Sequence, residues 1–209
     1  MIQPGKINLR NILVAAIGVF FTATGAVFNN CAGLGNDSIG IVYDGMRCFF
    51  GLSQSQLGTA SNIVNIVLVI LLLFVGRRYV SVGTLVYFIP YGMYANIATK
   101  LYGLLAFSDS LANNILFSVI GCLSLYFGVS VYITVDIGVD PFTGIVLWLT
   151  DTVKKEYRIV KIVFDFAMIA LGWALGGKAG VVTVLTALTA GPCIQFFHQK
   201  VKNVLTKEL

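Results

Sequence analysis

Two aspartates, Asp37 and Asp140, each follow a glycine by two residues within apolar sequence. Residues 35–38 (Gly-Asn-Asp-Ser) and 138–141 (Gly-Val-Asp-Pro) repeat one motif 103 positions apart. An aspartate accepts hydrogen bonds from the first amides of a helix, and a proline that follows it has no amide to leave unpaired. Within lipid such a helix start is costly, and its field can act on a solute. The motif therefore predicts two buried helix starts, whose aspartates either only cap or also contact a solute or proton.

Further polar side chains are expected at similar depths. Ionisable residues inside spans cost several kcal/mol and are functional candidates by default. Asp44 with Arg47, and Asp165 with Lys161, have the spacing of ion pairs on one helix face, which gate or merely stabilise. Tyr43, Tyr87, Tyr91 and Tyr94 either line a path or anchor at headgroups. The candidate residues for solute binding or proton coupling are Asp37, Asp140, Asn36, Asn30, Asn62, Asn65, Thr143, Asp44, Asp165, Thr84 and Thr183.

The sequence gives little support for catalysis, for metal or cofactor binding, or for nucleic-acid binding. The HExxH, GxSxG and Walker motifs of several enzyme classes do not occur, so we expect no catalytic residues. The four cysteines are scattered through apolar segments, and the single histidine, His198, lies beside lysines at a span end. We therefore expect no metal and no cofactor. The basic residues lie at span ends and tails, which excludes a nucleic-acid surface.

The composition is that of a membrane protein. Of 209 residues, 57% are hydrophobic and only 11% are charged, against roughly 25% charged in soluble domains. The apolar stretch at 11–31 is too long for the core of a cleaved signal peptide, so we read it as a retained span. The predicted spans are 11–31, 56–76, 80–99, 113–135, 157–176 and 179–198. The apolar segments 38–51 and 141–153 reach only about 20 Å, which indicates half-helices rather than full spans.

The chain also aligns with itself. The offset is 103 at the motif and 99 after it, which pairs Thr84 with Thr183 and Gly92 with Gly191. The predicted organisation is a first membrane repeat (1–98), a linker (99–112), a second repeat (113–199) and a cytoplasmic tail (200–209). Because each repeat holds an odd number of full spans, re-entrant half-helices would make the second copy inverted. The expected fold is therefore an all-α polytopic membrane protein with two inverted repeats.

The distribution of Lys and Arg bears on the orientation of the chain. A re-entrant arrangement and one with eight full crossings place equal numbers of these residues inside, so the count does not separate them. Both arrangements put both termini in the cytoplasm.

The second copy of the motif resembles a known family. Residues 137–144 (Ile-Gly-Val-Asp-Pro-Phe-Thr-Gly), followed by residues 172–180 and Thr183, are similar to the bacterial YczE/YitT group of integral membrane proteins. Residues 33–51 and Gly83-Thr84 resemble the N-terminal part of that group, but Ser38 stands where a proline is expected. The resemblance implies an inner-membrane protein of about six spans that moves or senses a small solute.

These features lead to two main hypotheses. The first is a secondary transporter or facilitator in the bacterial inner membrane, with a midplane site between the two half-helix starts. The second is a solute-binding membrane subunit of an energy-coupling-factor importer, which binds alone but does not transport alone. A structural or regulatory protein comes third. The expected partners are a small solute and the lipid bilayer. The sequence does not decide whether the protein forms a homodimer. Two acids at one place oppose an anion, which favours a neutral, zwitterionic or amine-bearing solute.

Overall fold

The computed structural model describes residues 7–106 and 110–207, and within them the chain is built from helices. The first six residues of the predicted first repeat, positions 107–109 of the predicted linker and the last two tail residues lie outside the described ranges. The helices are α1 (Leu9–Ala32), α2 (Ser38–Phe49), η1 (Gln54–Gln56), α3 (Leu57–Val75), η2 (Arg77–Tyr79), α4 (Val82–Leu105), α5 (Leu111–Val135), α6 (Pro141–Val153), α7 (Tyr157–Ala174) and α8 (Val181–Lys207).

Four of these segments are long and apolar enough to cross a membrane, namely Leu9–Ala32, Gln54–Val75, Leu111–Val135 and Val181–Leu205. The prediction of an all-α membrane protein is confirmed. Two helices are longer than predicted, because α4 continues to Leu105 and α8 continues to Lys207, past predicted span ends at 99 and 198.

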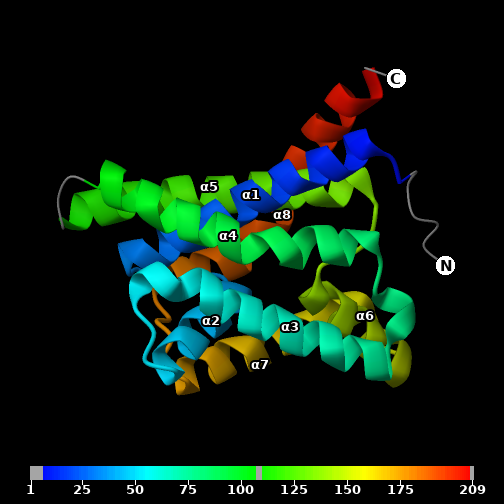
Figure 1. Ribbon diagram of the computed structural model, residues 1–209, viewed down its shortest axis with the longest axis horizontal. Coiled ribbons are helices and arrows are strands. Elements are labelled where there is room, and N and C mark those ends of the chain that lie inside the picture. Colours follow the sequence, from blue (N-terminus) through cyan, green and yellow to red (C-terminus); the bar gives the residue numbers. More distant parts are fainter. Residues whose placement is uncertain (1–6, 107–109, 208–209) are drawn as a thin grey trace.

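The helices form two layers (Figure 1). One layer contains α4, α1, α5 and α8, and the other contains α3, α2, α6 and α7. Each half of the chain contributes two helices to each layer, so the halves are interleaved rather than side by side. The pairing is also reciprocal, since α2 packs on α7 while α3 packs on α6.

The antiparallel crossing of α1 and α5 lies at the centre of the first layer. A Cβ atom built on Gly25 would lie 2.4 Å from the carbonyl oxygen of Gly121, and one on Gly18 would lie 2.9 Å from that of Gly128. These four glycines let the two backbones touch, as small residues do in membrane helix pairs. If α1 and α5 are equivalent helices of two repeats, as the sequence predicts, their opposite directions are those that an inverted duplication would have.

The two short helices confirm the predicted half-helices. They contain 12 residues in α2 and 13 in α6, which corresponds to about 20 Å. After α1 ends at Ala32 the chain turns back, because the side-chain amide of Asn36 donates to the carbonyl oxygen of Ala26 (2.8 Å). Ser38, the first residue of α2, contacts Asp165 in the middle of α7. The start of α2 therefore lies well inside the bundle, at the level of the middle of α7.

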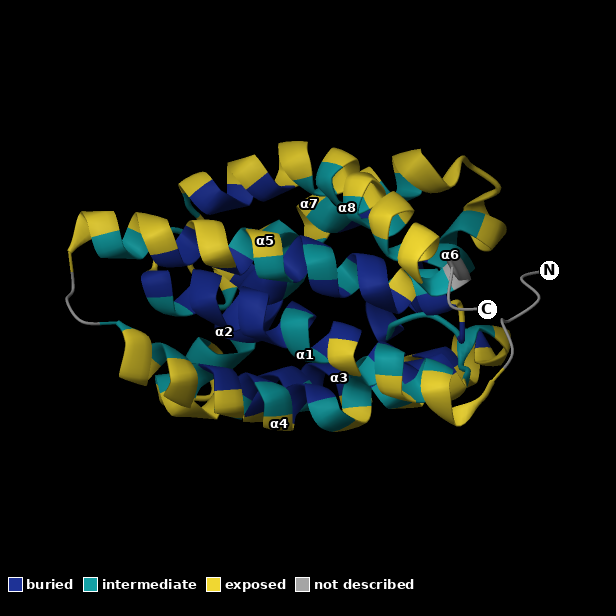
Figure 2. Ribbon diagram, turned by 90° about the horizontal axis from the view of Figure 1, so that it is seen from above, coloured by how far each residue is buried: buried dark blue, intermediate teal, exposed yellow. Residues whose placement is uncertain are grey.

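The core lies between the layers and around α1. Figure 2 shows α1 as the most deeply buried long helix, with exposed residues on the outer faces of the surrounding helices. The outward side chains are large and apolar, including Phe74, Trp173 and Leu188. Apolar side chains on the outside suit contact with lipid. The backbone meets the same requirement, because each helix satisfies its own hydrogen bonds.

Candidate functional site

Both predicted helix starts are capped by the aspartates of the motif. Oδ2 of Asp37 accepts from the amide of Ile39 (3.3 Å), and Oδ1 of Asp140 accepts from the amide of Thr143 (3.0 Å). Pro141 occupies the first helical position of α6, where no amide is needed. The capping part of the prediction is confirmed at both sites.

The two carboxylates differ in how many of their oxygens accept hydrogen bonds. Oδ2 of Asp140 accepts from the hydroxyl of Thr143, so both of its oxygens have partners. Oδ1 of Asp37 is buried and has no hydrogen-bond partner among the described residues. A buried acceptor without a partner costs free energy, and it calls for an explanation such as a bound proton, ion or ligand.

The loops that carry the motif, residues 33–37 and 136–140, are each held by the opposite repeat. The amide of Val182 at the start of α8 donates to the carbonyl of Leu34 (3.0 Å), and the amide of Gly83 at the start of α4 donates to that of Ile137 (3.1 Å). The two contacts are equivalent under the offsets of 103 and 99. The duplication inferred from the sequence thus appears as a reciprocal contact.

The motif glycines are needed where these contacts form. Gly35 and Gly138 have φ angles of 106° and 143°, which favour glycine. A Cβ atom on Gly35 would lie 2.6 Å from the amide nitrogen of Gly180, and one on Gly138 would overlap the side chain of Ser81. The motif glycine therefore serves both the turn and the close approach of the opposite repeat.

Thr84 and Thr183 complete the same contacts. The hydroxyl of Thr84 donates to the carbonyl of Val139 (2.8 Å), and the hydroxyl of Thr183 accepts from the amide of Asn36 (3.3 Å). Both threonines are buried. The structure places them against the motif loops, where they hold the backbone.

A cluster of buried tyrosines lies beside the start of α6. It consists of Tyr43 from α2, Tyr87 and Tyr91 from α4, and Tyr132 from α5, and every member is buried. Ring centroids lie 5.3 Å apart for Tyr43 and Tyr91 and 5.4 Å apart for Tyr87 and Tyr91. The ring of Tyr43 also packs against that of Phe142, the second residue of α6, with centroids 5.8 Å apart. The cluster therefore joins the start of α6 to side chains of α2, α4 and α5.

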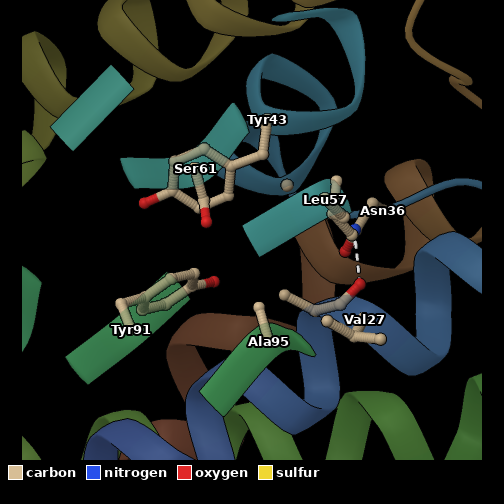
Figure 3. A pocket seen from close by; sticks show the side chains of 9 residues that line it. Val27, Asn36, Tyr43, Leu57, Ser61, Tyr91 and Ala95 are labelled. Carbon is tan, nitrogen blue, oxygen red and sulfur yellow. Dashed lines mark hydrogen bonds between the residues drawn. The ribbon is translucent and has the colours of Figure 1, made fainter. Parts of the chain in front are cut away.

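A cavity of about 10 Å³ adjoins this cluster (Figure 3). Asn36 and Gly40, which flank Asp37 in the sequence, are among the residues that line it, whereas Asp37 is not. Tyr43 and Ser61 lie across from Asn36 and Ala95 (Figure 3). A volume of this size holds about one water molecule. A larger solute would require the surrounding helices to separate.

The predicted pair of Asp165 and Lys161 is confirmed and belongs to the start of α2. The ammonium of Lys161 lies 2.5 Å from Oδ1 of Asp165, which also accepts from the hydroxyl of Ser38 (2.7 Å). Asp165 thus links Lys161 to the first residue of α2.

Asp44 and Arg47 form the other predicted pair, but at the end of α2 rather than at its start. The ion pair spans 2.8 Å, and Oδ2 of Asp44 accepts from the backbone amide of Lys178 (3.0 Å). Asp44 is 1% exposed. The pair ties the end of α2 to the turn between α7 and α8, away from the Asp37 cap.

The remaining candidates mostly hold helices together. Asn30 accepts from Gln54, and Asn62 accepts from the amide of Gly92 (3.1 Å). Asn65 accepts from the hydroxyl of Tyr43 (3.1 Å), which links it to the tyrosine cluster, and its amide nitrogen is buried without a partner. The structure thus gathers Asn36, Asp37, Asn65 and Asp165 near one site and leaves Asn30, Asn62 and Asp44 outside it.

Two site residues were not anticipated from the sequence, Ser61 and Tyr132. Ser61 lines the cavity, and the hydroxyl of Tyr132 is buried with no hydrogen-bond partner in the described part of the chain. Tyr132 lies 103 positions after Asn29, a buried polar residue of α1, so the repeat offset was a usable signal. Among residues 7–106 and 110–207, no three His, Cys, Asp or Glu side chains lie close enough to hold a metal ion.

Comparison with known proteins agrees with this picture. A protein of Haemophilus influenzae is 31% identical over 117 residues, covering 56% of this chain and 52% of that protein. The membrane protein YczE of Bacillus subtilis is 24% identical over 120 residues, covering 57% of this chain and 54% of YczE. The chain therefore spans about half the length of the curated relatives it matches, and the resemblance to the YczE group is confirmed. No solved structure matches the chain. The model of the family of unknown function DUF6198 matches residues 9–199, and the chain belongs to this family.

Proposed function

We propose that this membrane protein is a secondary transporter of a small solute, with its site between the starts of α2 and α6. The observation that carries the proposal is the buried, unpartnered oxygen of Asp37 at the start of α2, the helix whose Tyr43 joins a tyrosine cluster to which both repeats contribute. Inverted repeats with broken helices and a site at their interface are common in secondary transporters. The two interleaved layers supply the bundles that would move against each other.

Because the cavity is small, this mechanism requires the helices that line it to move apart. Its lining combines Tyr91 and Ala95 of the first layer with Tyr43 and Ser61 of the second. A movement of one layer against the other would therefore open the cavity to one end of the bundle at a time. The reciprocal loop contacts would keep the two half-helix starts aligned during that movement.

The proposal includes an orientation. The six long helices, α1, α3, α4, α5, α7 and α8, cross the bacterial inner membrane, α2 and α6 are re-entrant, and both termini are cytoplasmic. Single cysteines at Gln54 and at Val204, in a chain whose four native cysteines are replaced by alanine, test this arrangement. An impermeant maleimide added to whole cells should label position 54 and spare position 204. Equal labelling of both positions contradicts the orientation.

Transport itself is tested in proteoliposomes that contain a trapped pH dye. The full-length protein should give solute-dependent proton or solute flux without ATP, measured against a panel of neutral, zwitterionic, amine and carboxylate solutes. Asp37→Asn should abolish a pH-dependent flux, because Asn can cap but carries no charge. Asp151→Asn is the matched control, since Asp151 is exposed at the outer end of α6.

One outcome would count against the proposed site and another against secondary transport itself. If flux and its pH dependence survive both Asp37→Asn and Asp140→Asn, the aspartates are caps alone. If the protein binds a solute tightly without moving it, it is instead a binding subunit that requires an ATP-driven partner.

A further inference from the structure

The contact between α3 and α4 forms one wall of the cavity (Figure 3). Lining residues from these two helices are Leu57 and Ser61 of α3 and Tyr91 and Ala95 of α4. The residue that follows each of them lies in the contact itself, and these residues are Gly58, Asn62, Gly92 and Asn96. The cavity is therefore closed on this side only while the two helices stay together.

The contact is as close as two helices can make it. A Cβ atom on Gly58 would lie 2.1 Å from the carbonyl oxygen of Gly92, and one on Gly92 would lie 2.3 Å from the side-chain nitrogen of Asn62. Oδ1 of Asn62 also accepts from the backbone amide of Gly92 (3.1 Å). This approach leaves no path for a solute between α3 and α4.

Closing the contact also has a cost. Oδ1 of Asn96 would lie 2.4 Å from a Cβ atom on Gly58, and it is buried with no hydrogen-bond partner in the described part of the chain. A buried acceptor without a partner costs free energy, which is recovered when water reaches it. The hydrogen bond at Asn62 and the missing one at Asn96 thus oppose each other, which brings the closed and open arrangements nearer in free energy.

The corresponding helices of the second half are apart. The offset of 99 pairs Asn62 with Lys161 and Gly92 with Gly191. Within the described helices, α3 packs along α4, but α7 makes no comparable contact with α8. A Cβ atom on Gly191 would meet no described atom within 4 Å, and Lys161 is bonded to Asp165 instead. One of two equivalent contacts is closed, and the other is open.

We propose that the α3–α4 contact is a gate over the cavity. It is closed in this structure, and it opens when Gly58 and Gly92 separate while Lys161 and Gly191 come together. Each contact joins the two layers, so a rocking movement of one layer against the other exchanges them, as in transporters with inverted repeats. This inference rests on the proposed function for what passes the gate, but opening can be measured without any solute.

The first test measures how often the gate opens. A reporter, Ser61→Cys, is placed in the full-length chain whose four native cysteines are replaced by alanine. Ser61 is 1% exposed, so N-ethylmaleimide should label the reporter only when α3 and α4 separate. Gly58→Ala wedges the contact and should raise the labelling rate about fivefold or more. Gly103→Ala in α4, where the added atom meets no described atom within 4 Å, is the matched control and should change the rate less than about twofold.

A second reporter separates gating from general loosening of the bundle. Ala23 of α1 is 0% exposed and does not line the cavity. Ala23→Cys should therefore stay unlabelled in the presence of Gly58→Ala. Equal acceleration at both reporters would overturn the gate, because the whole bundle would then be opening. A Ser61→Cys rate that Gly58→Ala leaves unchanged would overturn it as well.

Asn62→Ala covers the case in which Gly58→Ala fails to fold. It removes the acceptor of the Gly92 amide and adds no atom to the contact. Labelling of Ser61→Cys should rise about threefold or more. An unchanged rate in this variant counts against the gate in the same way.

Cross-linking tests the exchange between the two contacts. Lys161→Cys with Gly191→Cys should form a disulfide under mild oxidation, and Gly58→Ala should raise its rate, because opening one contact closes the other. Lys161→Cys with Gly103→Cys is the control pair and should not cross-link. The exchange is overturned if the first pair does not cross-link, or if Gly58→Ala leaves its rate unchanged.

The gate and the proposed transport fail in different ways. Labelling that responds to Gly58→Ala, in a protein that moves no solute, overturns transport and leaves the gate standing. Solute flux in a protein whose labelling ignores Gly58→Ala overturns the gate and leaves transport standing.

Discussion

Thr84 and Thr183 make equivalent contacts from opposite halves of the chain, each to the motif loop of the other repeat. Thr84 donates to the carbonyl of Val139, and Thr183 accepts from the amide of Asn36. The same hydroxyls also accept from amides at their own helix starts, those of Ser81 and Gly180. Each threonine thus organises a helix start and a partner loop together.

Replacing either threonine with valine should destabilise the protein. Valine has a similar shape but no hydroxyl, so buried backbone groups in the motif loop and the helix start lose their partner. We expect a loss of about 1–3 kcal/mol for each variant, seen as a lower midpoint in thermal unfolding of the detergent-solubilised protein. Thr84→Ser and Thr183→Ser keep the hydroxyl and should lose much less. Serine variants as unstable as the valine variants would show that the methyl group, not the hydroxyl, carries the effect.

Much of this reciprocal contact could be predicted from the sequence. The part that could not be predicted has a physical reason. Aligning the chain on itself paired Thr84 with Thr183 and Asp37 with Asp140, because duplicated sites keep their polar residues. The alignment could not show that each threonine contacts the other repeat rather than its own. That depends on how α4 and α8 pack across the bundle, and apolar membrane sequence holds little information on packing partners.

The crossing of α1 and α5 offers a sharper stability test. Gly25→Ala would place a Cβ atom 2.4 Å from the carbonyl oxygen of Gly121, so the helices must move apart. We expect a loss of about 1–3 kcal/mol or more. Gly103→Ala is the control, since Gly103 lies in α4 with nothing within 4 Å of the added atom. It should be neutral or stabilising by up to about 1 kcal/mol. Thermal unfolding of both variants in the same detergent measures the two changes in stability. Equal changes for Gly25→Ala and Gly103→Ala would refute the close contact of α1 and α5.

The two ion pairs at the ends of the half-helices should differ in strength. Asp44 and Arg47 are 2% and 15% exposed in their side chains, whereas Asp151 and Arg78 are 53% and 68% exposed. Asp44→Asn should cost about 3–5 kcal/mol, because it leaves the guanidinium of Arg47 uncompensated. Asp151→Asn should cost about 0–1 kcal/mol, and added salt should erase that cost. Unfolding at low and high sodium chloride measures both, and a salt-sensitive Asp44 effect would contradict the burial.

The composition of the site was only partly visible in the sequence. Asp37 could be identified because a carboxylate after a glycine is rare inside apolar sequence. The tyrosines could not be assigned, since Tyr87 and Tyr91 had the pattern of headgroup anchors as much as that of a core. Their burial follows from the packing of α4 against α1 and α3, which depends on the tertiary structure.

Capping and charge can be separated at Asp37 through stability alone. Asn accepts from the helix amides nearly as well as Asp, so Asp37→Asn should keep the cap. It also removes the charge from a buried oxygen that has no partner, which offsets any loss. We therefore expect Asp37→Asn within about 1 kcal/mol of the parent protein, and Asp37→Ala less stable by about 0.5–2 kcal/mol. Thermal unfolding of the two variants gives the comparison. If Asn proves as damaging as Ala, the charge of Asp37, and not only its capping oxygen, holds the start of α2.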